Sequence, residues 1–563
     1  MLQVHEEGRY RHFVMVISVV FFFISSYFIF AHWLPQYRES GQMIFDWPDA
    51  MANFAFIESF IADNQFLIPF PDNSDIQNVV HPRSVNVFAG NLVPMGFIGQ
   101  VLLYGLIGKV IGVYGVLFLT PFFGSLAVYY YYRLCAKIFH NDLVGFISAA
   151  LLATQSAFVY YTMVVMLHTV LFVSLLIIGF WLLIKRNDTD KAVKKYTLIF
   201  FSGFTIGFAL AVRTVEAPWV LLSVLILSLI YARQKWWLSA LIFCFGLSAA
   251  FAPVFLINSQ LYGDALSFGY LKLHQSGEVF SRLPDAFKVS GQNQFERVIR
   301  AVFLPFGWNV KNLFKVGYFF ILQNFWPYLS LTVLGLVAFL RQKEKSLAMW
   351  VYLGIGSMIC LWLVLYYGNW RFDDLDVLRY ASISSSYTRY LLPFYILTIP
   401  GAAYFIYRLI SGSKAKFLRQ LAAIFIILGV VGFSGYSALF GQKADGLIHY
   451  DETTRRYYRQ FMVADAILPA NSLVITDRAD KYFFPKYQTV VFQLNYSIFP
   501  ELARVIDKYP IYYFTVMPDK DISYINREKI NEFNLILHQP ITIDDSYRLF
   551  RLDTLENFTK NQK

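Results

Sequence analysis

The chain has 563 residues, of which 57% are hydrophobic and only 15% are charged, and its mean hydropathy is +0.47. This composition excludes an ordinary soluble protein and predicts a polytopic membrane protein. The net charge of +11 does not indicate nucleic acid, because residues 441–563 carry sixteen basic and sixteen acidic side chains. The whole excess of positive charge therefore lies in residues 1–440. There, basic residues in loops indicate which loops are cytoplasmic.

The first apolar segment, about residues 13–30, precedes an acidic loop. No small-residue cleavage signature follows it, so we interpret it as a retained first span rather than a signal peptide. Arg9 and Arg11 predict a cytoplasmic N-terminus. Residues 31–91 carry seven acidic and two basic side chains, and we therefore expect this loop on the non-cytoplasmic side.

Residues 92–112 are predicted to form an interfacial or re-entrant helix, because a further span here would place Arg133 and Lys137 outside. Apolar segments of about twenty residues predict spans. About eleven are predicted: 13–30, 113–134, 143–162, 165–184, 196–212, 217–231, a seventh ending near 257, 317–340, a ninth ending near 367, a tenth after 393, and 417–436. In the loop after the seventh, helical spacing of apolar residues over 295–306 predicts an amphipathic surface helix.

The odd number of spans places residues 441–563 on the side opposite the N-terminus. Their composition is that of a soluble domain, and helical and strand patterns alternate. Helices are predicted at 453–468 and 499–509, and strands at 472–476, 489–494 and 511–516. The predicted fold class is an all-α polytopic membrane protein, residues 1–440, with a small extracytoplasmic α/β domain, residues 441–563.

Two carboxylates follow the first span within the run Asp46-Trp47-Pro48-Asp49. A carboxylate within hydrogen-bond reach of an acceptor hydroxyl is a natural general base. A helix start explains the same spacing equally well, with Asp46 as N-cap, Pro48 in the first turn and Asp49 favoured by the helix dipole. The residues alone leave both interpretations open.

Arginines at predicted outer span ends are candidates for binding a phosphate, because the guanidinium fork matches two phosphate oxygens. Arg389, followed by Tyr390, is the leading candidate and Arg213 the second. The alternative for each is an interfacial arginine whose head group reaches toward water. Glu216, three residues after Arg213, also suits a structural salt bridge.

Further polar residues stand in the outer loops. Arg83, in His81-Pro82-Arg83-Ser84, could hold a phosphate or orient the loop, and His168 could contact sugar or metal or be a structural histidine. Asp373, Asp374 and Asp376 could bind a divalent cation or form a solvated loop. Cys135, Cys244 and Cys360 lie in or beside apolar segments and predict neither disulfides nor a zinc site.

The order and sidedness of these motifs over residues 17–407 resemble the GT-C glycosyltransferases. The most similar branch contains protein mannosyltransferase-like and aminoarabinose transferase-like enzymes, the family 39-like glycosyltransferases. The resemblance implies transfer of a sugar from a polyprenyl-phosphate carrier to an acceptor on the non-cytoplasmic face of the plasma membrane, usually with inversion. It implies no cofactor, and a divalent cation is not expected.

The resemblance also implies roles for individual residues. The family's first-loop motif Pro-Asp-Glu falls on Pro48-Asp49, but Ala50 stands where Glu is usual. Asp46 therefore stays a second candidate, either as the base itself or as a residue that assists the base. The implied site has catalytic Asp49 and Asp46, donor-phosphate ligands Arg389, Arg213 and Arg83, and substrate contacts His81, His168, Glu216 and Tyr390. We expect Asp49 to border one cavity with Arg213 and Arg389.

Two other classes of function remain. A transporter or lipid-glycan flippase usually shows repeats and ionisable residues in mid-membrane, whereas here the charges lie at span ends and no repeat is present. A membrane scaffold would act through residues 441–563 alone. The sequence favours the enzyme.

Overall fold

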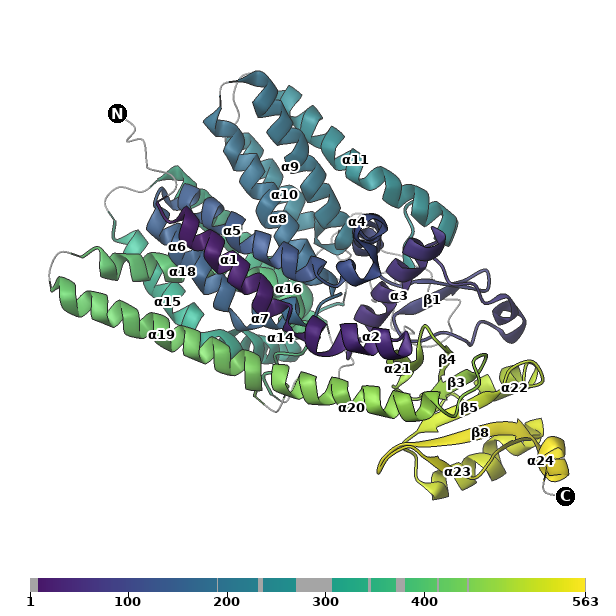
Figure 1. Cartoon of the computed structure of the whole chain (residues 1–563). Helices are drawn as coiled ribbons and strands as arrows, with labels where there is room; N and C mark the ends of the chain where they lie inside the picture. The colour runs from purple at the N-terminus through teal and green to yellow at the C-terminus, as the bar shows by residue number, and fades with distance from the viewer. Residues whose placement is uncertain are drawn as a thin grey trace. The chain divides into compact units, whose positions relative to one another are not determined.

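The computed structural model describes residues 9–189, 191–230, 236–269, 306–342, 346–370, 380–412, 415–442 and 445–561 (Figure 1). The chain divides into two compact units. The first contains Met1–Tyr27, Phe118–Pro253 and Phe280–His449, and the second contains Phe28–Leu117, Val254–Val279 and Tyr450–Lys563. The predicted helix at 295–306 and the aspartates Asp373, Asp374 and Asp376 lie outside the described residues, apart from Phe306.

The first unit is helical, as its long apolar segments require. Its helices are α1 (Arg11–Ser25), α5 (Leu119–Phe139), α6 (Asp142–Thr154), α7 (Ser156–Met163), α8 (His168–Lys185), α9 (Ala192–Val212), α10 (Ala217–Ile230), most of α11 (Trp236–Tyr262), α14 (Val310–Val316), α15 (Asn324–Leu340), α16 (Leu347–Asn369), α17 (Ser386–Tyr390), α18 (Leu392–Ile410) and α19 (Lys416–Phe440). Small residues allow close packing: a Cβ on Gly335 of α15 would lie 2.0 Å from the carbonyl oxygen of Gly401 in α18.

Within the described residues, nine helices are long and apolar enough to cross a membrane, or ten if the bent pair α6 and α7 forms one span. The predicted number was about eleven. Helix α10 falls short in length, and α5, which carries four consecutive tyrosines from Tyr129 to Tyr132, is not among the nine. In contrast, α4 (Gly99–Val116) qualifies, although an interfacial or re-entrant helix was predicted there.

The second unit begins with the loop that follows α1. Its elements are η1 (Ile29–Trp33), α2 (Leu34–Ser40), α3 (Pro48–Asp63), η2 (Pro71–Ile76), β1 (Val85–Phe88), β2 (Asn91–Pro94) and α4. The strands form an antiparallel hairpin with Phe88 opposite Asn91. Ala89 and Gly90 both have positive φ, as a two-residue type I′ turn requires. The prediction of helix from residue 92 is therefore wrong at its start, because residues 91–94 form a strand.

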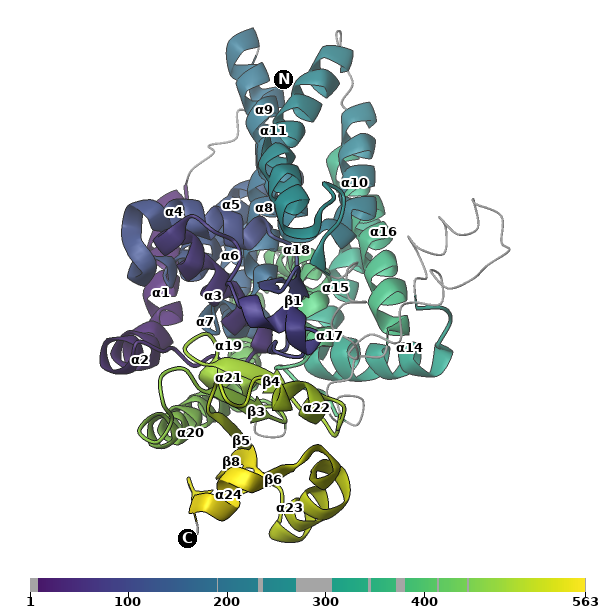
Figure 2. The same cartoon turned by 90° about the vertical axis from the view of Figure 1, so that its right-hand side faces the viewer.

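The C-terminal part of the second unit is an α/β domain (Figure 2). It contains α20 (Leu447–Asp465), β3 (Leu473–Thr476), α21 (Asp480–Phe483), β4 (Gln488–Val491), α22 (Ile498–Ala503), β5 (Ile511–Thr515), α23 (Asp519–Ile525), β6 (Leu535–Leu537), β7 (Ile541–Thr542), β8 (Arg548–Thr554) and α24 (Leu555–Asn561). The strand order is β4-β3-β5-β8-β6, with β3 parallel to β4 and β5, and β8 antiparallel to its neighbours. The predicted α/β class is confirmed, and the three predicted strands are β3, β4 and β5.

The loop after α1 and the C-terminal domain share one hydrophobic core. Phe70, Ile76 and Val80 are buried together with residues of β3, β4 and β5. His81 forms a parallel backbone bridge with Val490, on the outer edge of edge strand β4. The compact units thus group this loop with residues 450–563, whereas the predicted boundary at 440 grouped it with the membrane part. Segments that share a core must lie on the same side of the membrane.

A labelling experiment checks this arrangement. Ser74 in the loop and Ser546 in the domain are both exposed. Single cysteines at these positions, in a background with the exposed Cys244 replaced by Ala, are expected to react with a membrane-impermeant maleimide from the same side of sealed vesicles. Reaction of only one of them would contradict the shared core. Reaction of both in inverted vesicles only would reverse the predicted orientation.

Candidate active site

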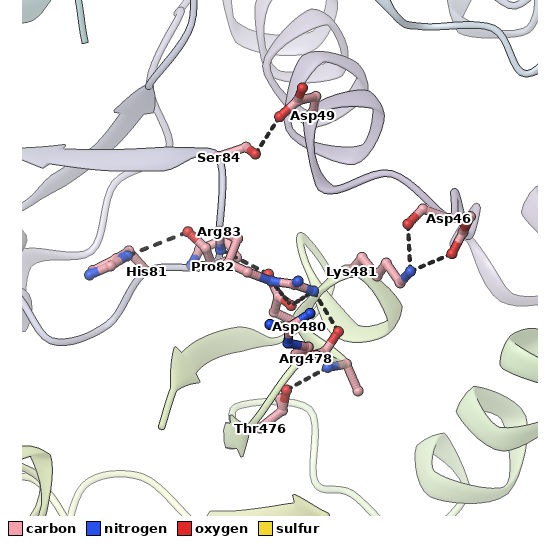
Figure 3. Close-up of polar contacts among 11 residues, drawn as sticks. Asp46, Asp49, His81, Pro82, Arg83, Ser84, Thr476, Arg478, Asp480 and Lys481 are labelled. Atoms are coloured by element: carbon pink, nitrogen blue, oxygen red, sulfur yellow. Dashed lines mark hydrogen bonds and ion pairs between the residues drawn. The ribbon is translucent and has the colours of Figure 1, made fainter. Parts of the chain in front are cut away.

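Asp49 lies in the first turn of α3. The helix begins at Pro48, whose fixed φ suits the first helical position. The residue before it, Trp47, has extended backbone angles and is the N-cap. The alternative interpretation of this run as a helix start is thus right for Pro48 and Asp49 and wrong in making Asp46 the N-cap. The Ser84 hydroxyl donates a hydrogen bond of 2.6 Å to Oδ1 of Asp49 (Figure 3). The Ser84 hydroxyl therefore helps to orient this carboxylate.

Asp46 has a different environment. Its Oδ1 lies 2.5 Å from Nζ of Lys481, which also donates to the backbone carbonyl of Asp46 at 2.5 Å (Figure 3). Asp46 is thus held in contact with α21, and which of the two carboxylates acts as the base stays a prediction.

Arg83 is bound to the C-terminal domain. Its Nε and Nη2 donate to Oδ1 of Asp480 at 2.9 and 2.6 Å, and its backbone N–H donates to Oδ2 at 2.8 Å. Nη2 also donates to the carbonyl of Arg478 at 2.5 Å. These contacts support the second of the two roles weighed for Arg83, orientation of the loop, over phosphate binding.

His81 is half-buried beside β4, and burial lowers the pKa of its imidazole below the ordinary value. The carbonyl of Pro82 and the charge of Asp480 oppose that shift without overcoming it. The imidazole is therefore neutral at pH 7. The neutral, partly buried imidazole and the backbone bridge of His81 to the sheet are consistent with a structural role. The predicted contact of His81 with substrate stays a prediction.

The lowered pKa of His81 predicts a pH dependence of stability. The unfolded chain takes up the proton near pH 6.5 and the folded chain only at lower pH. Stability from this residue is thus present above about pH 6.5 and is lost as pH falls toward the folded pKa. We expect the Tm of the purified protein to fall between pH 7 and pH 5, and to fall less for His81→Gln. Equal falls would contradict this assignment.

In the first unit, Arg213 and Glu216 form a buried ion pair, with side chains only 3% and 1% exposed. Nε and Nη2 of Arg213 donate to Oε1 of Glu216 at 3.1 and 2.8 Å. Tyr367 donates to the same oxygen at 2.6 Å, and Trp219 donates to Oε2 at 2.6 Å. This is the salt bridge that the spacing of three residues predicted as the alternative to phosphate binding.

His168 is the first residue of α8 and accepts from Arg213, whose Nη1 lies 2.8 Å from its Nε2. Because arginine can only donate, Nε2 carries no proton and the neutral ring is protonated on Nδ1. The preceding turn is strained: Val165 and Met166 have φ of 46° and 55°, a region that costs a non-glycine residue about 1–3 kcal/mol. Strain beside a polar cluster often accompanies function.

Arg389 and Tyr390 end helix α17 and are buried. Nη2 of Arg389 donates to the Tyr390 hydroxyl at 2.8 Å. The guanidinium of Arg213 forms a cation–π contact with the Tyr390 ring, with its Cζ 4.4 Å from the ring centroid. The first unit thus brings together five of the predicted residues: Arg213, Glu216, His168, Arg389 and Tyr390.

The second unit brings together the other four, Asp46, Asp49, His81 and Arg83, around α21 and Ser84 (Figure 3). The sequence patterns indicated no role for Ser84, Asp480, Lys481 or Tyr367. In the parts of the chain that the structure describes, no group of three or more His, Cys, Asp or Glu is arranged to hold a metal ion.

No protein family model and no curated protein matches the chain. The solved structures that resemble it along most of its length include three that represent two proteins. ArnT from Cupriavidus metallidurans in the apo state has a TM-score of 0.55 at 8% identity, and the match covers 96% of this chain and 97% of that one.

The other two are of the Archaeoglobus fulgidus oligosaccharyltransferase. The complex with Zn and sulfate has a TM-score of 0.51 at 12% identity, covering 90% of this chain and 69% of that one. The enzyme tethered to an acceptor peptide containing the NVT sequon has a TM-score of 0.52 at 13% identity, covering 92% and 70%. Identities this low show the fold alone, and both relatives are GT-C glycosyltransferases. The chain therefore has the GT-C fold that its motifs resembled.

Proposed function

We propose that this chain is a membrane glycosyltransferase that moves a sugar from a polyprenyl-phosphate donor to a hydroxyl of a lipid, glycan or protein, with inversion, on the non-cytoplasmic face of the plasma membrane. The observation that carries the proposal is the match in fold to ArnT along 96% of the chain. Asp49, oriented by Ser84 at the start of α3, supplies the base that this chemistry needs.

Asp49 accepts the proton of the acceptor hydroxyl as its oxygen attacks the anomeric carbon. The bond from that carbon to the phosphate oxygen breaks on the opposite side, and the polyprenyl phosphate leaves with the electron pair and its negative charge. Arg389 stabilises that charge, because a buried guanidinium interacts more strongly with a developing negative charge than one in water does. No resident cofactor takes part.

Arg213 has a different part in this proposal. Its N–H groups already donate to Glu216, Tyr367 and His168. We therefore propose that Arg213 positions Tyr390, which accepts a hydrogen bond from Arg389. His168 and Tyr390 are the proposed contacts with the sugar. Arg213 is thus a positioning residue for Arg389 rather than the main ligand of the phosphate.

The test is incubation of the purified protein with polyprenyl-phosphate mannose, glucose and aminoarabinose and a panel of lipid, glycan and peptide acceptors. We expect one pair to give a product heavier by one sugar in the mass spectrum. Movement of the sugar lipid across proteoliposomes without any glycosylated product would favour the flippase. A scaffold would give neither.

Deletion of residues 441–563 is not a clean test of the scaffold alternative. The loop that carries Asp49 shares its core with that domain through Phe70, Ile76 and Val80. Removing the domain would expose this core and disturb the proposed base as well. Point variants in the interface between loop and domain separate the two functions better.

A further inference from the structure

Helix α21 of the C-terminal domain begins where the buried strand β3 ends. All four residues of β3 are buried, and the Thr476 hydroxyl oxygen accepts from the backbone N–H of Ala479 at 2.8 Å. The first two residues of α21, Asp480 and Lys481, are therefore held on a rigid support. Asp480 is fully buried, and the Lys481 side chain is only 11% exposed.

These two residues contact the first loop at two separate points (Figure 3). Asp480 binds both the side chain and the backbone N–H of Arg83. Lys481 binds both the side chain and the backbone carbonyl of Asp46. Contacts that include the backbone fix the path of the chain as well as a side chain, so the loop is held at residues 46 and 83.

Both points lie directly beside the proposed base. Asp46 precedes α3, whose first turn contains Asp49. Arg83 precedes Ser84, whose hydroxyl donates to Asp49 at 2.6 Å. Ser84 has φ of 61°, a left-handed conformation that is unfavourable for a residue with a side chain. The bound Arg83 offsets that cost and keeps Ser84 aimed at Asp49.

We propose that Asp480 and Lys481 form a two-point clamp that positions Asp49, so that the C-terminal domain is a working part of the catalytic site. This inference rests on the proposed function, because it gives Asp49 the role of base. The clamp residues are positioning residues: they act through Arg83, Ser84 and the start of α3. A misplacement of about 1 Å at a reacting group can cost on the order of 100-fold in rate.

The test measures kcat and donor KM for Asp480→Asn, Ser84→Ala and the double variant, with the donor that gives product among polyprenyl-phosphate mannose, glucose and aminoarabinose. Each single variant is expected to lower kcat by about 10- to 100-fold and to leave KM within about twofold. The double variant should be no slower than the slower single variant, because both changes break one chain of contacts. Ser84→Ala leaves the ion pair intact, so it keeps the test valid if Asp480→Asn folds poorly.

Asp72→Asn is the matched control. Asp72 also joins the loop to the C-terminal domain, through Lys508 at 2.9 Å and Tyr509 at 2.7 Å, but it lies in η2 rather than beside α3. Its kcat should stay within about twofold of the wild type. A purely structural role for the clamp would make Asp72→Asn and Asp480→Asn alike.

Hydrogen exchange of residues 46–51 gives a readout that does not depend on turnover. Asp480→Asn and Lys481→Met are expected to speed exchange there, and Asp72→Asn is not. Unchanged exchange overturns the clamp whatever the enzyme does. A wild-type kcat in Asp480→Asn and Ser84→Ala, when Asp49→Asn is inactive, also overturns the clamp and leaves the proposed function standing. If Asp49→Asn stays active, the proposed function itself fails.

Discussion

Asp49→Asn is expected to lower turnover by about two to four orders of magnitude, the range for loss of a general base. Asparagine is nearly isosteric, and its carboxamide oxygen can still accept from the Ser84 hydroxyl. The start of α3 should therefore survive, at a cost of about 0.3–1 kcal/mol from the lost charge near the helix N-terminus. Donor binding should also survive, because the proposed phosphate ligand is Arg389. Single-turnover transfer and donor binding, measured on the same preparation, check both statements.

Asp46→Asn is the natural comparison for this experiment. The asparagine oxygen can still accept from Lys481, and the backbone carbonyl contact with that residue is unaffected. We expect a loss of less than about tenfold, the effect of weakening one partly buried ion pair whose hydrogen bonds remain. If Asp46→Asn abolishes transfer while Asp49→Asn stays active, the base is the other carboxylate. If both stay active, this loop does not carry the base.

Composition and hydrophobic length were sufficient to predict the membrane class and most spans. They misplaced the span predicted at 113–134, because α4 ends at Val116 and α5 runs from Leu119 to Phe139. They also failed at the hairpin of β1 and β2, although Ala89-Gly90 between apolar strands is a local turn signal that could have been recognised. The late strands β6 and β7 have three and two residues, which is too short for a period of two to be visible.

The candidate site, too, could be predicted from the sequence only in part. Local spacing predicted the Arg213–Glu216 pair, because residues three apart meet on one helical turn. It also drew attention to Asp49. The contacts of Arg83 and Asp46 could not be predicted, since their partners Asp480 and Lys481 follow about 400 residues later. A single sequence contains no signal that pairs residues so far apart, and only the fold brings them together.

Arg213→Met is expected to lower the free energy of unfolding by about 3–5 kcal/mol, the cost of removing one partner from a buried ion pair. The Glu216 side chain is 1% exposed, and without Arg213 its donors among the described residues would be the hydroxyl of Tyr367 and the indole N–H of Trp219. Those two neutral donors cannot replace a guanidinium in a place that water hardly reaches. Thermal and denaturant unfolding in detergent measure the loss.

The double variant Arg213→Met, Glu216→Gln separates structure from catalysis. Glutamine is neutral, and its oxygen still accepts from Tyr367 and Trp219, so most of the lost stability should return. Because we assign Arg213 to holding Tyr390 rather than to binding the donor, turnover should then recover to within about tenfold of the wild type. A stable double variant that is still more than 100-fold slower, a loss of the size seen when a charge-stabilising donor is removed, would show that Arg213 contacts the donor phosphate. In that case Arg389 would not be the only cation at the leaving group.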